Sequence, residues 1–280
     1  MSSSDVAMRV RRPRFLASEL RLVFTRRRNL TMLAVLAVAP LLIGIAIRVG
    51  NRHPRGGGPA FIGQITSNGL FLAFTSLVVT LPLFLPLVVS VVSGESVAGE
   101  AATGTLRTLL VVPVSRTRLL LVKYAGIAAY AVAATAVVGL SAVVVGLALF
   151  PTGPVTLLSG DTIPMSAAFV RIVLVVLYVA AMLVGVGALG LFVSTLTEVP
   201  LAAMATTAIL VIVLEILDAI PQLSSLGPYL LTHWWLQFGD LVRDPIPYDG
   251  LRQGLLVTLA YVVVLGSLAW ARLSTRDITS

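Results

Sequence analysis

Residues 94–123 read GESVAGEAATGTLRTLLVVPVSRTRLLLVK, a stretch in which acidic and basic side chains recur between two long apolar runs. The flanking runs, Leu70–Val92 and Ala125–Phe150, contain no Asp, Glu, Lys or Arg. Each is long enough to cross a hydrocarbon layer of about 30 Å as a helix. The charged stretch between them, called the island below, must therefore lie outside the lipid.

The composition of the whole chain places it among integral membrane proteins. Hydrophobic residues make up 58% of the sequence and charged residues only 11%, with a mean hydropathy of +1.00. Soluble domains carry about twice that share of charge. Because the apolar runs are continuous rather than alternating, they predict helices and not the strands of a barrel. The expected fold class is all-α and polytopic.

Six transmembrane spans are expected, separated by polar and proline-containing breaks. They lie at Leu30–Ile47, Leu70–Val92, Ala125–Phe150, Ile172–Val193, Leu201–Ile220 and Gly254–Ala271. The corresponding regions are an N-terminal basic segment (1–29), a transmembrane domain (30–272) containing a cytoplasmic coupling segment (94–124) and an outer segment (221–250), and a cytoplasmic tail (273–280). Pro82 and Pro86 are expected to kink the second span.

Basic residues set the expected orientation. With the N-terminus inside, most of the 20 Lys and Arg residues fall in cytoplasmic segments, and they are densest before the first span. This distribution follows the positive-inside rule. We therefore expect a multi-pass protein of the cell membrane with both termini in the cytoplasm. The net charge of +8 suits contact with anionic membrane lipids, and no nucleic-acid-binding module is recognisable.

Before the first span, Arg14–Arg28 has the pattern of an amphipathic helix. An apolar stripe runs along one face, and basic residues line up on another. The stripe consists of Leu16, Leu20, Val23 and Phe24, and the basic face of Arg14, Arg21 and Arg28. This pattern predicts a helix docked at the membrane interface, with a solvated basic tail as the alternative. Arg27 falls on the stripe, so the helix is expected to end or turn before it.

Within the island, Gly104 releases the chain and a short apolar stripe follows. Leu106, Leu109 and Leu110 recur at helical spacing, and Pro113 then ends the pattern. The stripe predicts a short helix parallel to the membrane that docks into a groove of a cytoplasmic partner. The alternative is an amphipathic loop that lies on lipid headgroups.

The island resembles that of a known family, the membrane permeases of the second export-type class of ATP-binding-cassette (ABC) transporters. The matching pattern is Glu95 and Glu100, Gly104-Thr105-Leu106, Leu109-Leu110, Pro113, Ser115-Arg116 and Lys123. The resemblance extends to six spans in this order. It implies that two permease chains pair, as homodimer or heterodimer, and that two separate nucleotide-binding subunits drive them. Closure of those subunits on ATP would be transmitted through the island.

The resemblance also implies which residues couple the chain to its motor. They are Glu95, Glu100, Gly104, Thr105, Leu106, Arg107, Leu109, Leu110, Pro113 and Arg116. For the three charged residues Glu95, Glu100 and Arg107, solvation without a partner is the competing interpretation, and an ion pair between Glu100 and Arg107 is a further expectation. ATP and Mg are expected on the partner subunit. A phosphate-binding loop of the G-x-x-x-x-G-K-[ST] kind needs a Gly before its Lys. Lys123 is the sole lysine of the chain and Val122 precedes it, so the chain cannot supply an ATP site of this kind.

Two features are expected on the outer side. Glu215 lies inside the fifth predicted span, where it either lines a transport path or, with Asp218, sits at the wet outer interface. The aromatic run Leu230–Phe238 is too short to span and predicts a re-entrant or interfacial helix, with simple anchoring as the alternative.

The function expected from these observations is that of an ABC exporter permease for a hydrophobic or amphipathic cargo. The chain itself is expected to be a transport subunit and not an enzyme, with no cofactor and no metal site of its own. It has no cysteine, and His53 and His233 lie in different predicted outer loops. An ion-coupled secondary transporter and a polytopic membrane enzyme remain the alternatives, although neither coupling charges in broken helices nor an H-E-x-x-H motif is recognisable.

Overall fold

The computed structural model describes residues 12–50, 68–103 and 115–275. Within these ranges, six helices are long and apolar enough to cross a membrane. They are Arg27–Gly50, Phe84–Ala102, Arg116–Leu149, Met165–Leu196, Pro200–Ala219 and Tyr248–Thr275. The expected all-α, polytopic membrane fold is confirmed.

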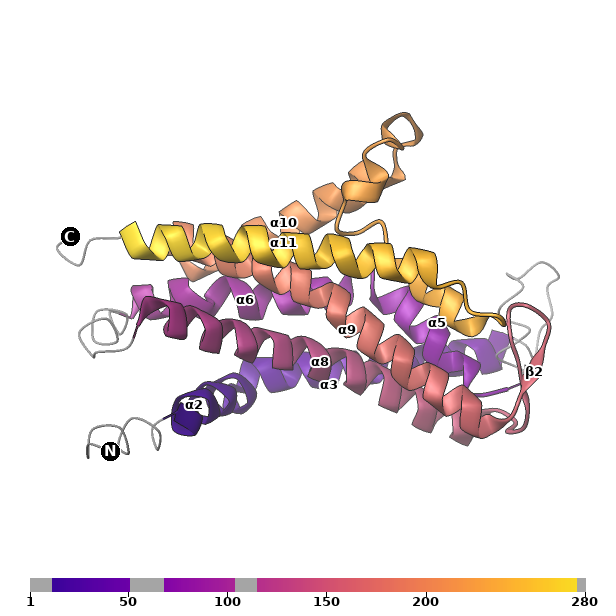
Figure 1. The fold of residues 1–280 in the computed structure, drawn as a ribbon. Helices are drawn as coiled ribbons and strands as arrows, with labels where there is room; N and C mark the ends of the chain where they lie inside the picture. Colours follow the sequence, from indigo (N-terminus) through magenta and orange to yellow (C-terminus); the bar gives the residue numbers. More distant parts are fainter. Residues whose placement is uncertain (1–11, 51–67, 104–114, 276–280) are drawn as a thin grey trace, which may run out of the picture.

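The described elements are mainly long helices that lie side by side in a bundle (Figure 1). The α-helices are α2 (Arg12–Thr25), α3 (Arg27–Gly50), α5 (Phe71–Thr80), α6 (Phe84–Ala102), α8 (Arg116–Leu149), α9 (Met165–Leu196), α10 (Pro200–Ala219) and α11 (Tyr248–Thr275). A two-stranded antiparallel hairpin, β1 (Val155–Thr156) and β2 (Thr162–Ile163), joins α8 to α9. Three 3-10 helices, η1 (Pro221–Leu223), η2 (Gly227–Tyr229) and η3 (Trp235–Val242), join α10 to α11.

The second predicted span is two helices rather than one kinked helix. The chain leaves helical geometry between α5 and α6, and Pro82 lies in this break. Proline has no N–H to donate and its ring clashes with the preceding turn, which explains the interruption. Pro86 falls in the first turn of α6, where a missing N–H costs no intrahelical bond. Helix α6 then continues to Ala102, ten residues beyond the predicted end of the span, and carries part of the island as helix.

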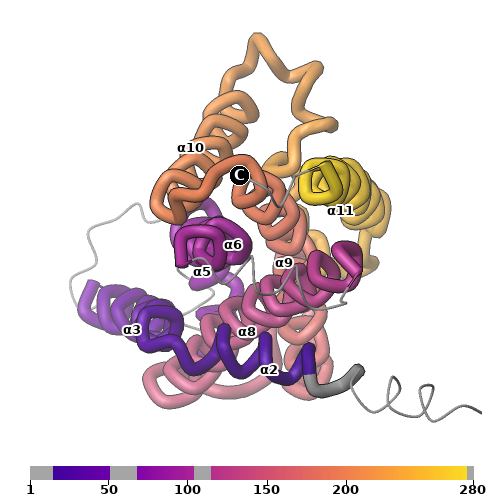
Figure 2. The backbone as a smooth tube through the Cα atoms, turned by 90° about the vertical axis from the view of Figure 1, so that its left-hand side faces the viewer, coloured from indigo at the N-terminus to yellow at the C-terminus, as the bar shows by residue number. Residues whose placement is uncertain are grey.

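Helix α9 forms the centre of the bundle and packs against α6, α8, α10 and α11 (Figure 2). Its glycines permit this close approach. A Cβ on Gly187 would lie 2.7 Å from Ile127 Cγ2 of α8, and one on Gly185 would lie 2.7 Å from Leu231 Cδ1. A larger side chain at either position would push these neighbours away. Both glycines therefore serve close packing within this chain.

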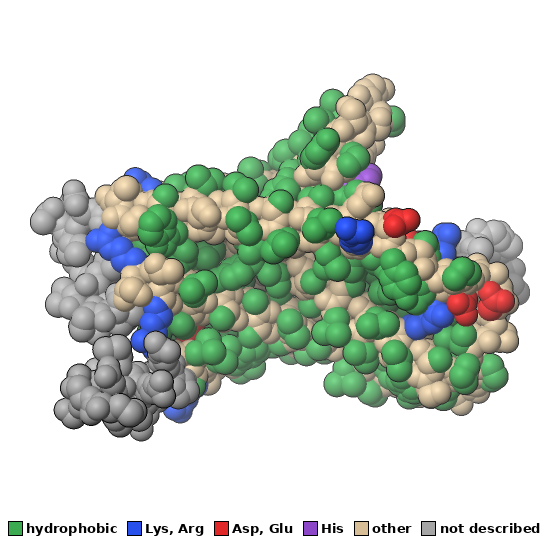
Figure 3. Space-filling view, in the orientation of Figure 1, with side chains coloured by type: hydrophobic (Ala, Val, Ile, Leu, Met, Phe, Trp, Pro, Cys, Tyr) green, Lys and Arg blue, Asp and Glu red, His purple; other side chains and the backbone are tan. Residues whose placement is uncertain are grey.

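The two ends of the bundle differ in what they hold. Helix α2, the end of α6, the start of α8 and the end of α11 gather at the left of Figure 1, called the island end here. The strands β1 and β2 lie at the opposite, hairpin end. On the face drawn in Figure 3, hydrophobic side chains cover the middle of the molecule and charged ones collect toward the two ends. This distribution is that of a bundle whose middle faces lipid.

The segment between α10 and α11 is not the single membrane-lying helix that its aromatic residues predict. It forms η1, η2 and η3 instead. Pro221 is the first residue of η1 and Pro228 the second of η2, positions at which the missing N–H costs no intrahelical bond. Trp235 and Phe238 of η3 are buried, and η3 packs against α9 and α11. The aromatic residues therefore anchor this segment to the bundle.

Candidate functional site

At the island end, acidic and basic side chains from four helices and one connecting residue form a charge cluster that joins helices far apart in the sequence. Its members are Glu19 of α2, Arg26 between α2 and α3, Arg28 of α3, Glu95 and Glu100 of α6, and Lys123 of α8. Three acids face three bases, so the cluster is formally neutral. This arrangement makes it the most concentrated set of ion pairs among the described residues.

Lys123 is the buried centre of the cluster. Its side chain is 2% exposed, and its Nζ is ion-paired with Glu100 and lies 3.2 Å from Glu19 Oε1. A buried ammonium without a partner costs several kcal/mol, so the two carboxylates are needed to hold it there. The sole lysine of the chain thereby fastens α8 to both α2 and α6.

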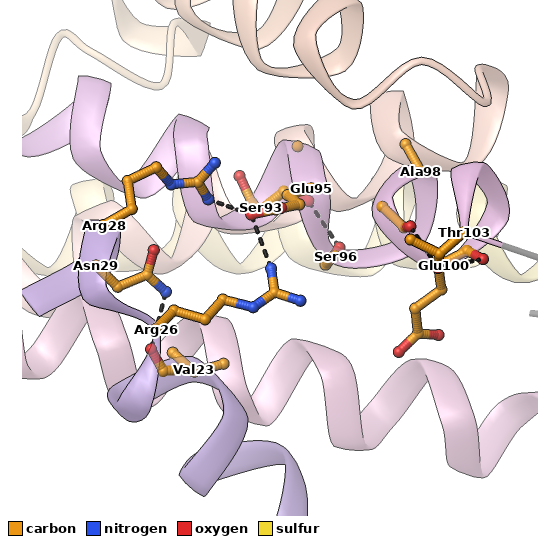
Figure 4. Close-up of polar contacts among 12 residues, drawn as sticks. Val23, Arg26, Arg28, Asn29, Ser93, Glu95, Ser96, Ala98, Glu100 and Thr103 are labelled. Carbon is orange, nitrogen blue, oxygen red and sulfur yellow. Dashed lines mark hydrogen bonds and ion pairs between the residues drawn. The ribbon is translucent and has the colours of Figure 1, made fainter. Parts of the chain in front are cut away.

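Glu95 makes the second set of ion pairs, on another side of α6. Arg26 Nη1 lies 2.8 Å from Glu95 Oε2, and the Arg28 guanidinium binds the same oxygen. Figure 4 shows both guanidinium groups pointing at the Glu95 carboxylate, with Glu100 directed elsewhere. Residues five apart on an α-helix project about 140° from each other. Helix α6 is therefore held from two directions close to its C-terminal end at Ala102.

The turn between α2 and α3 is fixed by a buried asparagine. Asn29 is 2% exposed and donates from Nδ2 to the Val23 carbonyl at 2.8 Å. Tyr130 of α8 donates its hydroxyl to the Asn29 carbonyl at 2.9 Å. Phe24 packs at a tilt on the Tyr130 ring, with centroids 5.9 Å apart. Helix α2 ends at Thr25, before Arg27 as expected, and docks on α8.

The cluster encloses only a small cavity. Its volume is about 20 Å³, and its lining includes Glu19, Asn29, Glu95, Glu100 and Lys123. Pockets for organic ligands occupy about 300–1,000 Å³. The cluster is therefore a joint between helices and not a binding site for an organic substrate.

A serine of the central helix adds a further link to α6 beside the cluster. Ser194 Oγ donates to the Gly94 carbonyl at 2.6 Å and accepts from the amides of Val97 and Ala98 at 3.0 and 2.9 Å. Ser194 itself is fully buried. The hydroxyl thus bonds the backbone of α6 on both sides of Glu95 and holds this stretch against α9.

Arg116 starts α8 and reaches across to the end of α11. The Ser115 side chain caps α8 by accepting from the Arg118 amide, which explains why the helix begins here. Arg116 donates from Nη1 to the Leu273 carbonyl at 2.8 Å and also to the Ser274 carbonyl. Arg116, one of the predicted coupling residues, therefore joins the island directly to α11.

The structure brings together only some of the residues predicted to couple the chain to a motor. Glu95 and Glu100 enter the charge cluster, and Arg116 lies at the start of α8. The remaining predicted coupling residues lie outside the described residues. They are Gly104, Thr105, Leu106, Arg107, Leu109, Leu110 and Pro113. Glu100 pairs with Lys123, whereas the expected pairing with Arg107 involves a residue outside the described ranges.

The sequence analysis did not predict that Arg26, Arg28, Lys123 and Glu19 belong to a charge cluster. Lys123 was predictable as a residue in need of a partner, because it is a lone charge between Leu119 and Phe150. Arg26 and Arg28 were interpreted only as part of a basic segment. Their shared partner, Glu95, is more than 65 residues away in the sequence, and no local pattern indicates such a pairing.

Glu215 lies apart from this cluster, near the C-terminal end of α10. It is half-buried, and Asp218 one turn later pairs with His233, with 2.6 Å between Oδ1 and Nδ1. A transport path at Glu215 remains a prediction. No group of three or more His, Cys, Asp or Glu suited to a metal ion occurs in the described ranges.

Comparison with known families gives one match. A family model described as "Protein of unknown function (DUF2705)" matches residues 57–279, most of the chain. Among curated proteins, none matches.

Proposed function

Since the chain belongs to the family described as a protein of unknown function (DUF2705), we propose its activity from its own residues: it is the membrane-spanning permease subunit of an ATP-driven ABC exporter. The observation that carries the proposal is the island, whose pattern resembles that of such permeases. The charge cluster at its base supports it further, because Glu95 and Glu100 attach the island to helices on two sides.

In the proposed mechanism, two separate nucleotide-binding subunits carry ATP and Mg and close on each other. Their motion pushes on the island, which is continuous with α6 before it and α8 after it. The Glu100–Lys123 pair carries the displacement to α8 and, through Glu19, to α2. The pairs of Glu95 with Arg26 and Arg28 carry it to α3.

The permease works as a pair of chains, either identical or related, and alternately exposes a path between them. The largely apolar bundle suits a hydrophobic or amphipathic cargo, with Glu215 as a candidate for the path. The island end faces the cytoplasm of the cell in this proposal, which places α2 at the inner membrane interface and both termini inside. The basic residues at this end, including Arg26 and Arg28, support the orientation.

The test is purification of the tagged full chain from its native membrane in mild detergent, with mass spectrometry and an ATPase assay of what accompanies it. We expect a nucleotide-binding subunit and ATPase activity. The double variant Leu106→Ala, Leu109→Ala should lose the subunit, because it removes the apolar stripe that docks on it.

A matched control makes two similar truncations away from the island. The double variant Leu140→Ala, Val144→Ala changes two highly exposed positions on the lipid-facing side of α8 and should keep both the subunit and the activity. A chain that comes alone and ATP-inert, under conditions that preserve known membrane complexes, would overturn the proposal. An ion-coupled transporter or a membrane enzyme would then take its place.

A further inference from the structure

A large apolar groove runs along the bundle near the island end, between α8, α9 and α11. Its volume is about 940 Å³, at the upper end of the range of about 300–1,000 Å³ that ligand pockets occupy. The groove exists because α8 and α11 both pack extensively on α9 but touch each other little. Figure 2 shows α9 set between the two at this end of the molecule.

The walls of the groove contain no charged residue. They are formed by Thr117, Leu120, Leu121 and Tyr124 of α8, Ala188 and Leu191 of α9, and Val262, Val263, Gly266, Ser267, Leu268, Trp270 and Ala271 of α11. Gly266 has open space in front of it, since an added Cβ would meet no atom within 4 Å. The groove therefore has room beside Gly266 that the chain itself does not fill.

At the island end, polar contacts close the groove and cations stand beside it. Trp270 Nε1 donates to Thr117 Oγ1 at 2.9 Å, which joins α11 to α8 across the end of the groove. Tryptophan is typical of the level at which a membrane meets water. Arg116 and Arg118 flank Thr117 in the sequence. Arg116 donates to the Leu273 and Ser274 carbonyls, and the Arg118 guanidinium lies 6.0 Å from the centre of the Phe15 ring. Within the described ranges neither arginine is ion-paired with a carboxylate, so the positive charge of both is uncompensated there.

We propose that this groove binds a membrane lipid: an anionic glycerophospholipid of the leaflet at the island end, with acyl chain along α8, α9 and α11 and phosphate beside Arg116 and Arg118. The apolar walls suit the acyl chain, and the two arginines, which have no carboxylate partner in the described ranges, suit the phosphate. Because lipid tails are as apolar as the groove, the tail alone gives little preference over the bulk bilayer. The preference for this lipid comes from the headgroup.

Charge also argues against the obvious competing occupant, a second copy of the chain seated in the same groove. A two-fold interface uses the same surface patch on both copies. Each copy would then bring its own Arg116 and Arg118 to this patch, and like charges would face each other at the membrane surface. An anionic headgroup removes that conflict. The inference concerns the chain alone and does not depend on the proposed ATP-driven partner.

The test is native mass spectrometry of the full chain released from nanodiscs that contain equal amounts of phosphatidylglycerol and phosphatidylcholine. Each basic residue at the surface is worth about fivefold in anionic-lipid binding, so phosphatidylglycerol should dominate the bound lipid. The variant Gly266→Phe should lose about tenfold in bound lipid, because its ring fills the free space in the groove. Val264→Phe on an exposed face of the same helix is the control and should bind as the wild type does.

Neutralising the two arginines should distinguish the contribution of the headgroup to lipid binding from that of the acyl chain. In Arg116→Gln, Arg118→Gln, lipid should still be retained, but phosphatidylglycerol and phosphatidylcholine should be bound about equally. A second measurement needs no variant: phosphatidylglycerol with a photoreactive acyl chain should crosslink to peptides 120–124 and 262–271 of the wild-type chain. Crosslinks elsewhere, or equal lipid retention by Gly266→Phe and wild type, would overturn the proposal. A loss of dimer with no change in bound lipid would assign the groove to a second copy instead.

Discussion

The island end of the bundle and the C-terminal end of α10 both hold ion pairs, but the pairs connect different parts of the chain. At the island end, Lys123 is 2% exposed and joins residues of two other helices. At the C-terminal end of α10, Asp218 pairs with His233 across a short segment, and their side chains are 27% and 37% exposed. The first set therefore links helices within the bundle, whereas the second orders a connecting segment at its surface.

This difference in burial determines how each end responds to perturbation. Exposed pairs contribute about 0–1 kcal/mol because water and salt screen them. Breaking a buried pair leaves an uncompensated charge and costs about 3–5 kcal/mol. The island end is thus the part of the molecule where moving one helix must move the others. This property is what a coupling region requires.

The largest expected effect comes from removing Lys123. Lys123→Met leaves Glu19 and Glu100 close together without their cation and should lower the free energy of unfolding by about 3–5 kcal/mol. Thermal unfolding of the purified chain in detergent, followed by circular dichroism, measures the loss. The triple variant Lys123→Met, Glu19→Gln, Glu100→Gln removes the charges together and should recover most of it. If Lys123→Met unfolds like the wild type, the pairing at the island end is not what holds α2 and α6 to α8.

The next effect concerns Ser194, which links the same stretch of α6 to the central helix without charge. Ser194→Ala removes a hydroxyl that bonds three backbone groups and should cost about 1–2 kcal/mol in unfolding free energy. Ser141→Ala is the matched control, because that hydroxyl bonds only the Val138 carbonyl of its own helix. Equal melting shifts in the two variants would contradict the role of Ser194 as a link between helices.

A smaller change in stability, but a visible change in docking, is expected from Glu95. Its arginine partners are 40% and 43% exposed, so Glu95→Gln should cost about 1 kcal/mol or less. It should nevertheless loosen the attachment of α6 to the segment that joins α2 and α3. Spin labels at Leu22→Cys and Val132→Cys, both exposed, report the distance between α2 and α8, and the chain has no native cysteine to interfere.

In double electron–electron resonance, the distance distribution for these labels should broaden in Glu95→Gln relative to the parent. Asp249→Asn, which removes an exposed acid at the start of α11, is the control and should leave the distribution unchanged. An unchanged distribution in Glu95→Gln would show that packing of Phe24 and Val23 on α8 suffices to dock α2.

Much of the fold was predictable because lipid restricts what a backbone can do. A continuous apolar run such as Ala125–Phe150 can satisfy its N–H and C=O groups in hydrocarbon only as a helix, so composition and length predict α8. The end of α2 before Arg27 was predictable for a related reason, since a charge on the apolar stripe cannot dock. The division into α5 and α6 was only partly anticipated, because Pro82 indicates a kink but not its extent.

The candidate site was harder to predict, because its contacts are non-local. Glu95 and Glu100 were identified from a family resemblance, but nothing in the sequence indicates that they point in different directions to different partners. Helix α6 had to extend past Val92 for that geometry to arise. The aromatic residues near Trp235 misled for another reason: they indicated a single membrane-lying helix, whereas the segment forms separate 3-10 helices, and η3, with Trp235 and Phe238 buried, packs on α9.

The smallest effect should come from the C-terminal end of α10, and it tests the comparison at its more exposed ion pair. Asp218→Asn breaks the pair with His233 but leaves both side chains in contact with water, so unfolding free energy should change by about 0.5 kcal/mol or less. The variant should melt within error of the wild type at both low and high salt, whereas Lys123→Met should be destabilised under both conditions, since salt screens buried charges poorly. A loss from Asp218→Asn as large as that from Lys123→Met would mean that the two ends are held equally tightly. Burial would then not distinguish a joint between helices from an ordered connecting segment.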